Sequence, residues 1–352
     1  MGAPLLEVED LRVHFETEDG LVKAVDGISY TVDRGQTLGI VGESGSGKSV
    51  SSLTVMGLTR ARNARISGTV RFDGRDLLGS SDETLRQIRG NEIAMIFQDP
   101  LSSLHPFYKV GDQIVEGIRA HREVSKAQAY DRAVEMLGLV GIPEPRRRAD
   151  AYPHEFSGGM RQRAMIAMAL ANDPKLLIAD EPTTALDVTV QAQILELIER
   201  LQQEFDTAVV IITHDLGVVA EMADDIAVMY AGRIVERGDA DTVFNAPEHP
   251  YTWGLLSSIP RMDTPREEEL RPIAGRPPSL INLPGGCSFH PRCPYVREAH
   301  RRVDPALEPV EGDPRHRVAC LLDSRTRRRL WAELQAGVSP EAARRDVIEE
   351  AR

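Results

Sequence analysis

Residues 42–49 have the composition and spacing of a loop that binds phosphate. They follow the pattern G-x-x-x-x-G-K-S and are Gly42, Glu43, Ser44, Gly45, Ser46, Gly47, Lys48 and Ser49. Glycines let successive backbone N–H groups turn toward a polyphosphate, and a following helix directs its positive end at the same anion. Lys48 is expected to reach the β- and γ-phosphates, and the Ser49 hydroxyl to bind Mg²⁺. A chance glycine turn would not explain the lysine, the hydroxyl and both flanking segments together.

Two carboxylates follow the apolar run at residues 176–179. Asp180 is placed to hold Mg²⁺, directly or through water, and Glu181 to orient or deprotonate an attacking water. Paired acids at the end of a strand are often merely solvated. Behind a phosphate loop, however, the catalytic interpretation is the favoured one.

Two further polar residues come directly after apolar runs. Gln98 follows residues 93–97, and His214 follows residues 208–213. In open α/β sheets ligands bind at the carboxyl ends of the strands, so both side chains are candidates to face the phosphate loop, His214 toward the γ-phosphate. An ordinary glutamine at a strand end and a structural histidine remain the alternatives.

A second predicted helix N-terminus that could bind an anion lies at Ser157, Gly158 and Gly159. Ser157 can cap a helix expected over residues 160–171, and the two glycines leave its first N–H groups unobstructed. A simple helix cap would explain the serine but not two glycines ahead of Arg161 and Arg163.

The elements that must position these groups alternate along the chain, as in an α/β fold. Short apolar runs typical of buried strands occupy residues 37–41, 93–97, 176–179 and 208–213. Alternating patterns predict antiparallel strands within residues 5–34, 66–72, 226–230 and 233–237. Helical spacing covers residues 51–58, 77–88 and 190–201, and residues 112–139 form a helical insertion between two core strands.

Composition sets broad limits on the class of protein. The 352 residues are 41% hydrophobic and 27% charged, and the net charge of −12 argues against a surface that coats nucleic acid. No apolar run is long enough to span a bilayer, and the amino terminus lacks a secretory pattern. We therefore expect a cytosolic protein that meets a membrane only through a partner.

The six motifs together resemble those of ATP-binding cassette (ABC) ATPases over about residues 5–240. The resemblance identifies the Walker A loop, the Q-loop (Gln98), the signature (Ser157, Gly158, Gly159), Walker B (Asp180, catalytic Glu181), the D-loop (Ala185, Leu186, Asp187) and the H-loop (His214). It implies a P-loop NTPase of the RecA-like type with antiparallel β and helical subdomains, the latter at about residues 101–165. Gln98, with Ser49 and Asp180, would serve Mg²⁺. Phe15 lies where the family has its adenine-stacking aromatic, although from sequence alone a single aromatic on a strand more often belongs to the core.

The resemblance also implies a partner ATPase. In this family two nucleotide-binding domains stack head to tail, and the signature of one closes over the γ-phosphate held by the other. The chain carries one such set, with Met160 where many members have glutamine. An identical copy and a sibling chain both remain open as the partner.

The tail resembles that of ATPases from bacterial oligopeptide and dipeptide importers. Residues 1–240 are expected to form the nucleotide-binding domain, residues 241–284 a proline-rich linker, residues 285–323 a cysteine-containing region and residues 324–352 a helical tail. In that subfamily the ATPase docks beneath two membrane permease subunits, at the cytoplasmic side of the bacterial inner membrane. It drives uptake of peptides delivered by an external binding protein.

The three cysteines lie in this tail, too few for a disulfide framework. Relatives often carry four, some holding an iron–sulfur cluster, whereas here the set is Cys287, Cys293, His300 and Cys320. Three thiolates and an imidazole suit a [4Fe–4S] cluster or Zn²⁺. Buried, reduced thiols without a metal are the alternative.

The predicted function is therefore that of an ATPase subunit, using ATP and Mg²⁺, in an ABC peptide importer. Import of nickel or glutathione by the same type of ATPase remains an alternative. A soluble ABC protein of translation or DNA repair is a second alternative. Such proteins usually carry two cassettes or a long coiled-coil insertion, and the sequence has neither.

Overall fold

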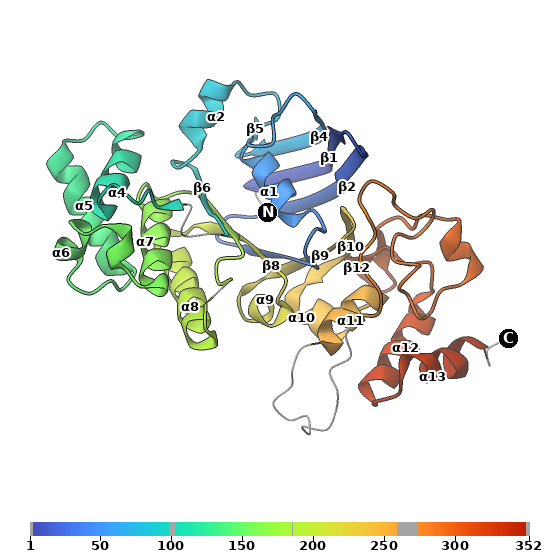
Figure 1. Cartoon of the computed structure of the whole chain (residues 1–352). Helices are drawn as coiled ribbons and strands as arrows, with labels where there is room; N and C mark the ends of the chain where they lie inside the picture. The colour runs from blue at the N-terminus through green and yellow to red at the C-terminus, as the bar shows by residue number, and fades with distance from the viewer. Residues whose placement is uncertain (1–2, 99–102, 185, 259–272, 350–352) are drawn as a thin grey trace.

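The structure, a computed structural model, describes residues 3–98, 103–184, 186–258 and 273–349. Figure 1 shows two β-sheets, a helical lobe at one side formed by α4 to α7, and a C-terminal region at the other. The C-terminal region comprises the described residues from Ala240 onward. Ala185 of the expected D-loop and residues 259–272 of the expected linker lie outside the described residues.

The smaller sheet is antiparallel, with strand order β2-β1-β4-β5. Its strands are β1 (Leu6–Thr17), β2 (Gly20–Val32), β4 (Ala64–Phe72) and β5 (Arg75–Asp76). Apolar side chains that alternate along β1 and β2 fill one buried core together with residues of the larger sheet. Helix α2 (Asp82–Ile88) begins later than the expected residue 77, because Ser81 caps it by accepting a hydrogen bond from the Thr84 N–H.

The larger sheet has eight strands in the order β11-β12-β10-β9-β3-β8-β7-β6. The parallel part contains β6 (Ile93–Ile96), β7 (Leu176–Asp180), β8 (Ala208–Thr213), β3 (Thr37–Val41) and β9 (Asp225–Tyr230). Every residue of β3, β7 and β8 is buried, as expected for strands covered on both faces. The carboxyl ends of β3, β6, β7 and β8 therefore lie at one edge of the sheet.

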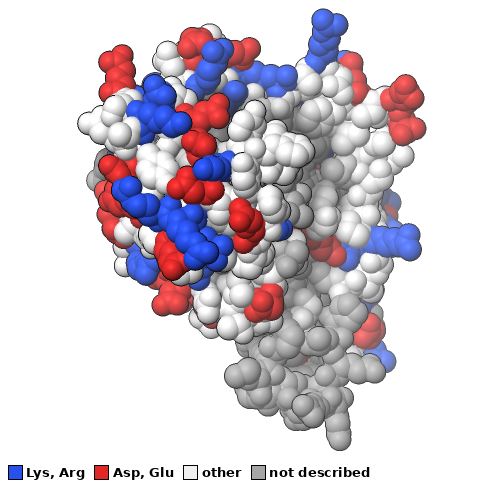
Figure 2. All heavy atoms as spheres, turned by 60° about the vertical axis from the view of Figure 1, so that its left-hand side comes forward, with Lys and Arg blue, Asp and Glu red and all other residues white. Residues whose placement is uncertain are grey.

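Within the described residues, the other helices up to β9 are α1 (Lys48–Val55), α4 (Val110–Arg119), α5 (Lys126–Leu139), α6 (Pro145–Ala149), η1 (Pro153–Glu155), α7 (Gly158–Leu170), α8 (Val188–Phe205) and α9 (Leu216–Met222). Helices α4, α5 and α6 pack on one another in the helical lobe, whereas α7 contacts β6 and α9 contacts β3 and β8. Figure 2 turns the helical lobe forward, and on that face Lys and Arg are interspersed with Asp and Glu. Exposed ion pairs such as Arg146 with Asp131 and Lys109 with Asp150 belong to this lobe.

The C-terminal region joins the core sheet directly, which sequence reasoning did not predict. Strand β10 (Arg233–Asp239) pairs with β12 (Asp313–Val318), which in turn pairs with β11 (Glu308–Val310). The remaining helices are α10 (Ala240–Asn245), α11 (Pro250–Ser257), η2 (Glu298–Arg301), α12 (Ser324–Gln335), α13 (Pro340–Arg344) and η3 (Arg345–Glu349). Within the described ranges, every helix is too short or too polar to traverse a lipid bilayer.

Candidate active site

The phosphate loop connects β3 to α1, as the sequence predicts. Its tight path requires glycine at Gly47, where φ is +101° and a Cβ atom would lie 2.1 Å from the Ala24 carbonyl oxygen. Gly47 is also the residue before the first turn of α1. The glycine-rich loop and the start of α1 therefore direct backbone N–H groups to one place, which suits a polyphosphate.

Lys48 is folded back onto the phosphate loop. Its Nζ donates to the carbonyl oxygens of Gly42 at 2.6 Å and Glu43 at 3.0 Å, and the residue is 5% exposed. Burial lowers the pKa of the Lys48 ammonium, and the nearby carboxylates of Glu181 and Asp180 oppose that shift. The cation is thus held by neutral carbonyl groups, which a triphosphate can replace as its partner.

Ser49 and Asp180 bring a hydroxyl and a carboxylate together at the same edge of the sheet. The Ser49 hydroxyl donates to Asp180 Oδ1 at 3.0 Å, and Asp180 is 5% exposed. Burial raises the pKa of the Asp180 carboxyl, and the hydrogen bond from Ser49 opposes that shift. A hydroxyl and a carboxylate at this distance fit Mg²⁺, which prefers hard oxygen ligands.

Glu181 contacts three side chains, two of which follow neighbouring strands. Its carboxylate accepts hydrogen bonds from Gln98 Nε2 at 2.7 Å and from Thr184 Oγ1 at 2.9 Å, and it lies 3.5 Å from His214 Nδ1. Gln98 follows β6, Glu181 follows β7 and His214 follows β8, so the order of the parallel strands brings them together. Glu181 also has φ of +46°, a costly conformation for a non-glycine residue and one that occurs at functional sites.

The Ser157 segment starts helix α7 in the helical lobe. The Ser157 hydroxyl accepts a hydrogen bond from the Met160 N–H at 3.3 Å, as a helix cap does. Ser157 and Gly158 are exposed, and among the described residues no heavy atom outside its own helical turn lies within 4 Å of the position where Gly158 would carry a Cβ. Figure 1 shows α7 apart from α1. The structure therefore does not bring Ser157, Gly158 and Gly159 to the phosphate loop of the same chain.

Two other predicted residues have local partners. Asp187 caps α8 by accepting from the Val190 N–H at 3.0 Å and is exposed. Phe15 pairs across the small sheet with Val22 and Ala64, and its half-buried ring packs against the core. These contacts show how the protein holds Asp187 and Phe15. Their predicted contacts with a nucleotide remain predictions.

Comparisons with known proteins show to which family the chain belongs. The family described as "ABC transporter" matches residues 25–184, and the family "Oligopeptide/dipeptide transporter, C-terminal region" matches residues 235–299. The oligopeptide transport ATP-binding protein OppD of Salmonella typhimurium is 55% identical over 86% of this chain and 89% of that protein. OppD of Bacillus subtilis is 54% identical over 86% of this chain and 85% of that protein. The chain belongs to the ABC transporter family of oligopeptide transport ATP-binding proteins.

Solved ABC structures agree with this assignment. The dimeric post-hydrolysis state of the ATP-binding cassette MJ0796, bound to ADP and Pi, has a TM-score of 0.60 and 26% identity over 67% of this chain and 98% of that chain. The protein cbiO1 from Clostridium perfringens has a TM-score of 0.59 and 29% identity over 70% of this chain and 92% of that chain. The predicted fold class and ATPase activity are confirmed for this ABC chain.

The prediction of a metal centre in the ABC chain's tail is not supported by the structure. Cys287, Cys293, His300 and Cys320 are all described, yet the described residues contain no group of three or more His, Cys, Asp or Glu side chains that could hold a metal ion. The thiols pack with the hydrophobic core instead. Burial raises the pKa of Cys320 to about 11 and also raises the pKa of Cys293, so in the absence of a metal these thiols stay protonated. Neither an iron–sulfur cluster nor Zn²⁺ is supported.

Sequence reasoning missed three residues around the nucleotide site of this ABC protein. Thr184 lies three residues after Glu181, at a spacing where a threonine hydroxyl can reach back to the carboxylate. That spacing could have indicated the contact from sequence. Tyr251 and Arg292 contact Glu43 of the phosphate loop from the C-terminal region. Each lies more than 200 residues from Glu43 in the sequence, so no local pattern could indicate these contacts.

Proposed function

We propose that the chain is the ATP-hydrolysing subunit of a bacterial importer of oligopeptides or dipeptides. It would work at the cytoplasmic side of the inner membrane, beneath two permease subunits that receive peptide from an external binding protein. The observation that carries the proposal is the polar cluster around Glu181, next to a phosphate loop, in a chain related to OppD proteins over most of its length.

The residues at the edge of the sheet have distinct roles in this proposal. The loop N–H groups and Lys48 bind the triphosphate, and Phe15 stacks on the adenine. Ser49, Asp180 and Gln98 would hold Mg²⁺, which when bound neutralises charge on the phosphates. Glu181 takes a proton from the attacking water, while Gln98 and Thr184 fix its carboxylate. His214 lies on the other side of that carboxylate, where it can contact the γ-phosphate.

A second ATPase subunit completes the site in this proposal. Ser157 and Gly158 are exposed at the start of a helix that does not meet its own phosphate loop, so they are free to close over the nucleotide of a partner. Asp187 at the start of α8 would lie at the same contact. Two of the solved structures similar to this chain are described as dimeric.

A mixing experiment tests the partner. Lys48→Ala and Ser157→Arg each remove one half of the composite site, so each variant alone should be inactive. If the chain pairs with itself, mixing the two variants restores one intact site and part of the ATPase activity. If it pairs with a sibling chain, the mixture stays inactive until that sibling is added. A strictly monomeric preparation with full ATPase activity would contradict the composite site.

Reconstitution tests the cargo. The chain, its permease pair and the binding protein are placed in lipid vesicles, and uptake of a radiolabelled tripeptide or pentapeptide is followed with ATP on the cytoplasmic side. The proposal expects uptake that stops with Glu181→Gln. Uptake of nickel or glutathione without uptake of either peptide would replace the cargo and leave the ATPase role in place.

A further inference from the structure

The phosphate loop is held from outside by a residue of the C-terminal region. Arg292 donates to both carboxylate oxygens of Glu43, from its two terminal nitrogens, at 2.5 Å and 2.9 Å. The Arg292 side chain is 3% exposed, whereas that of Glu43 is 29% exposed. A two-pronged contact of this kind fixes the direction as well as the charge of the carboxylate.

A second contact fixes the backbone of the same loop residue. The Glu43 N–H donates to the hydroxyl of Tyr251 at 2.7 Å. The Tyr251 ring packs against Tyr230 and Phe289, with ring centroids 4.7 Å and 5.5 Å away, so the hydroxyl is held in place. Glu43 thus has both its side chain and its N–H bound by the C-terminal part of the chain.

Two further donors of Arg292 are also bound, which makes its position well defined. Its Nε donates to the Ala274 carbonyl oxygen at 3.0 Å, and one terminal nitrogen also donates to the Ile273 carbonyl oxygen at 3.3 Å. The guanidinium lies over the Tyr230 ring, 5.8 Å from its centroid. Arg292 therefore joins the phosphate loop, the end of β9 and the segment at residues 273–274.

The charge of Glu43 matters because of its place in the loop. Lys48 Nζ donates to the Glu43 carbonyl oxygen, so this residue lies beside the cation that binds phosphate. A carboxylate there has the same sign as a triphosphate and repels it over several ångströms unless a cation compensates it. Arg292 supplies that compensation from a buried position, where charges are weakly screened.

From these contacts we propose that Arg292 and Tyr251 are positioning residues of the nucleotide site, and that the C-terminal region thereby contributes to the affinity for ATP. The inference rests on the proposed ATPase function. Arg292 cancels the Glu43 charge beside the phosphates, and Tyr251 holds the loop backbone in the shape that accepts them. Neither residue is expected to take part in the chemical step.

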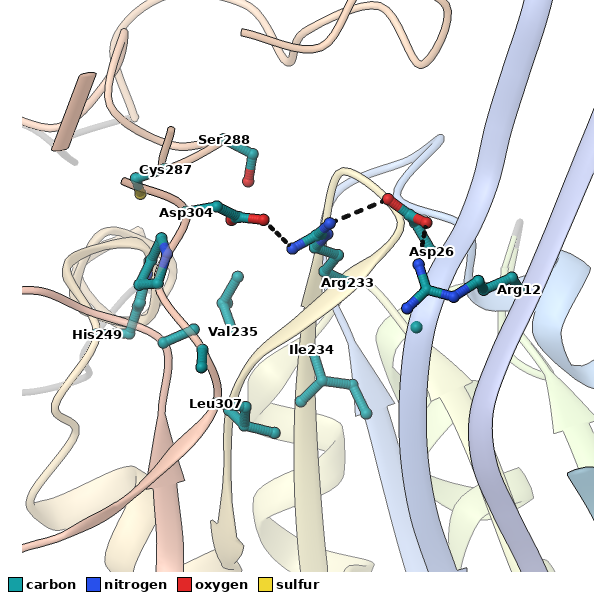
Figure 3. A pocket seen from close by; sticks show the side chains of 14 residues that line it. Arg12, Asp26, Arg233, Ile234, Val235, His249, Cys287, Ser288, Asp304 and Leu307 are labelled. Atoms are coloured by element: carbon teal, nitrogen blue, oxygen red, sulfur yellow. Dashed lines mark hydrogen bonds and ion pairs between the residues drawn. The ribbon is translucent and has the colours of Figure 1, made fainter. Parts of the chain in front are cut away.

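The C-terminal region has other attachments to the core, so loss of Arg292 alone should not release it. Strand β12 pairs with β10 in the main sheet. Figure 3 shows Arg233 between Asp26 of β2 and Asp304 of the C-terminal region, at a cavity of about 190 Å³. Arg12 pairs with the same Asp26 at 2.7 Å. These contacts make an Arg292 variant a test of the loop rather than of folding.

The test measures ATP affinity and turnover separately in the full-length chain. Equilibrium titration with a fluorescent N-methylanthraniloyl ATP and Mg²⁺ gives Kd, and steady-state ATPase assays give KM and kcat. Arg292→Ala should raise both Kd and KM about tenfold and change kcat less than about twofold, because the exposed charge of Glu43 then acts against binding. Arg302→Ala, which removes an exposed partner of Glu298, is the matched control and should leave Kd unchanged.

A double variant separates charge from structure. In Glu43→Gln/Arg292→Ala the repelling carboxylate is gone, so Kd should return to within about threefold of the wild type. An unchanged Kd in Arg292→Ala, or no recovery in the double variant, would overturn the proposal.

If Arg292→Ala does not fold, Tyr251→Phe keeps the ring and removes only the hydroxyl. A raised Kd there supports the proposal and an unchanged Kd overturns it. A wild-type chain that fails to bind ATP would instead overturn the proposed function.

Discussion

The nucleotide site and the C-terminal region both gather polar side chains from distant parts of the chain, but they use them in opposite ways. At the nucleotide site, Gln98, Glu181 and His214 come from successive strand ends and keep partial access to solvent. Where β10 meets the C-terminal region, the fully buried Glu236 accepts hydrogen bonds from the N–H groups of Glu248 and His249 and contacts His316 Nε2 at 2.8 Å. The first set is available to a substrate, whereas the second is committed to the fold.

This difference predicts that substitutions in the two regions affect different measurements. Buried polar groups whose partners are all within the protein should control the free energy of unfolding. Groups at the open edge of the parallel sheet should control ATP binding and turnover and change stability little. The variants below test that division from the largest effect to the smallest.

Glu236→Ala should give the largest effect, a loss of about 3–5 kcal/mol in the free energy of unfolding. The change removes a buried carboxylate and leaves two backbone N–H groups and His316 without their acceptor. Urea unfolding followed by circular dichroism measures the loss. The exposed Glu308→Ala on β11 is the control and should stay within about 0.5 kcal/mol of the wild type.

Lys48→Ala should weaken ATP binding about 100-fold, because charged hydrogen bonds to the phosphates are lost. Its stability should not fall, since the hydrogen bonds of the buried ammonium to described residues go to two neutral carbonyl oxygens. Titration with ATP and urea unfolding of the same preparation give both quantities. A large fall in stability with little change in ATP affinity would reverse the proposed division between the regions.

The pH dependence of stability should report the C-terminal region through His249. Burial lowers the pKa of His249 to about 3, with the charge of Arg327 as a second cause. Because the unfolded state binds a proton below pH 6.5 and the folded state does not, this residue contributes stability that is lost as pH falls from 6.5 toward 3. The loss is roughly 1.4 kcal/mol per pH unit.

His249→Asn isolates that contribution. Asparagine can accept the hydrogen bond that His249 Nδ1 receives from the Tyr251 N–H, but it does not titrate. The unfolding free energy of this variant should fall less steeply between pH 6.5 and 4.5 than that of the wild type. Identical slopes for the two proteins would remove His249 from the explanation.

Thr184→Val should give the smallest effect, a decrease of about fivefold in kcat for one hydrogen bond of about 1 kcal/mol. Valine keeps the volume of threonine but cannot donate to Glu181. ATPase assays at saturating ATP measure the decrease, and Thr189→Val, at an exposed position on α8, is the control. An unchanged kcat would show that Gln98 alone is enough to orient the carboxylate.

The nucleotide site could be predicted from sequence because its residues are tied to local patterns. Glycine spacing defines the phosphate loop, and each of Gln98, Glu181 and His214 follows a short apolar strand. Parallel topology then brings those strand ends to one edge, so local order becomes spatial order. The same reasoning found Ser157 as a helix cap, and its contact with a partner remains a prediction.

The C-terminal region could not be predicted in this way. The spacing of Cys287, Cys293 and Cys320 suggested a metal site, whereas in the structure the thiols pack with the core and the described residues form no metal-binding group. Strand β12 contains Asp313, Pro314 and three basic residues, a composition that does not indicate a strand, and pairing with β10 overrides it. Contacts between residues more than 200 positions apart, such as Arg292 with Glu43, follow from tertiary structure alone.

Turnover by Glu181→Gln tests most directly whether the edge of the parallel sheet is the catalytic site. Glutamine keeps the shape of the side chain but cannot take a proton from water, so kcat should fall about 100-fold or more while the Kd for ATP stays within about threefold. Both quantities come from one preparation, by phosphate release and by nucleotide titration. Hydrolysis by Glu181→Gln at the wild-type rate would contradict the assignment of Glu181 as the catalytic base.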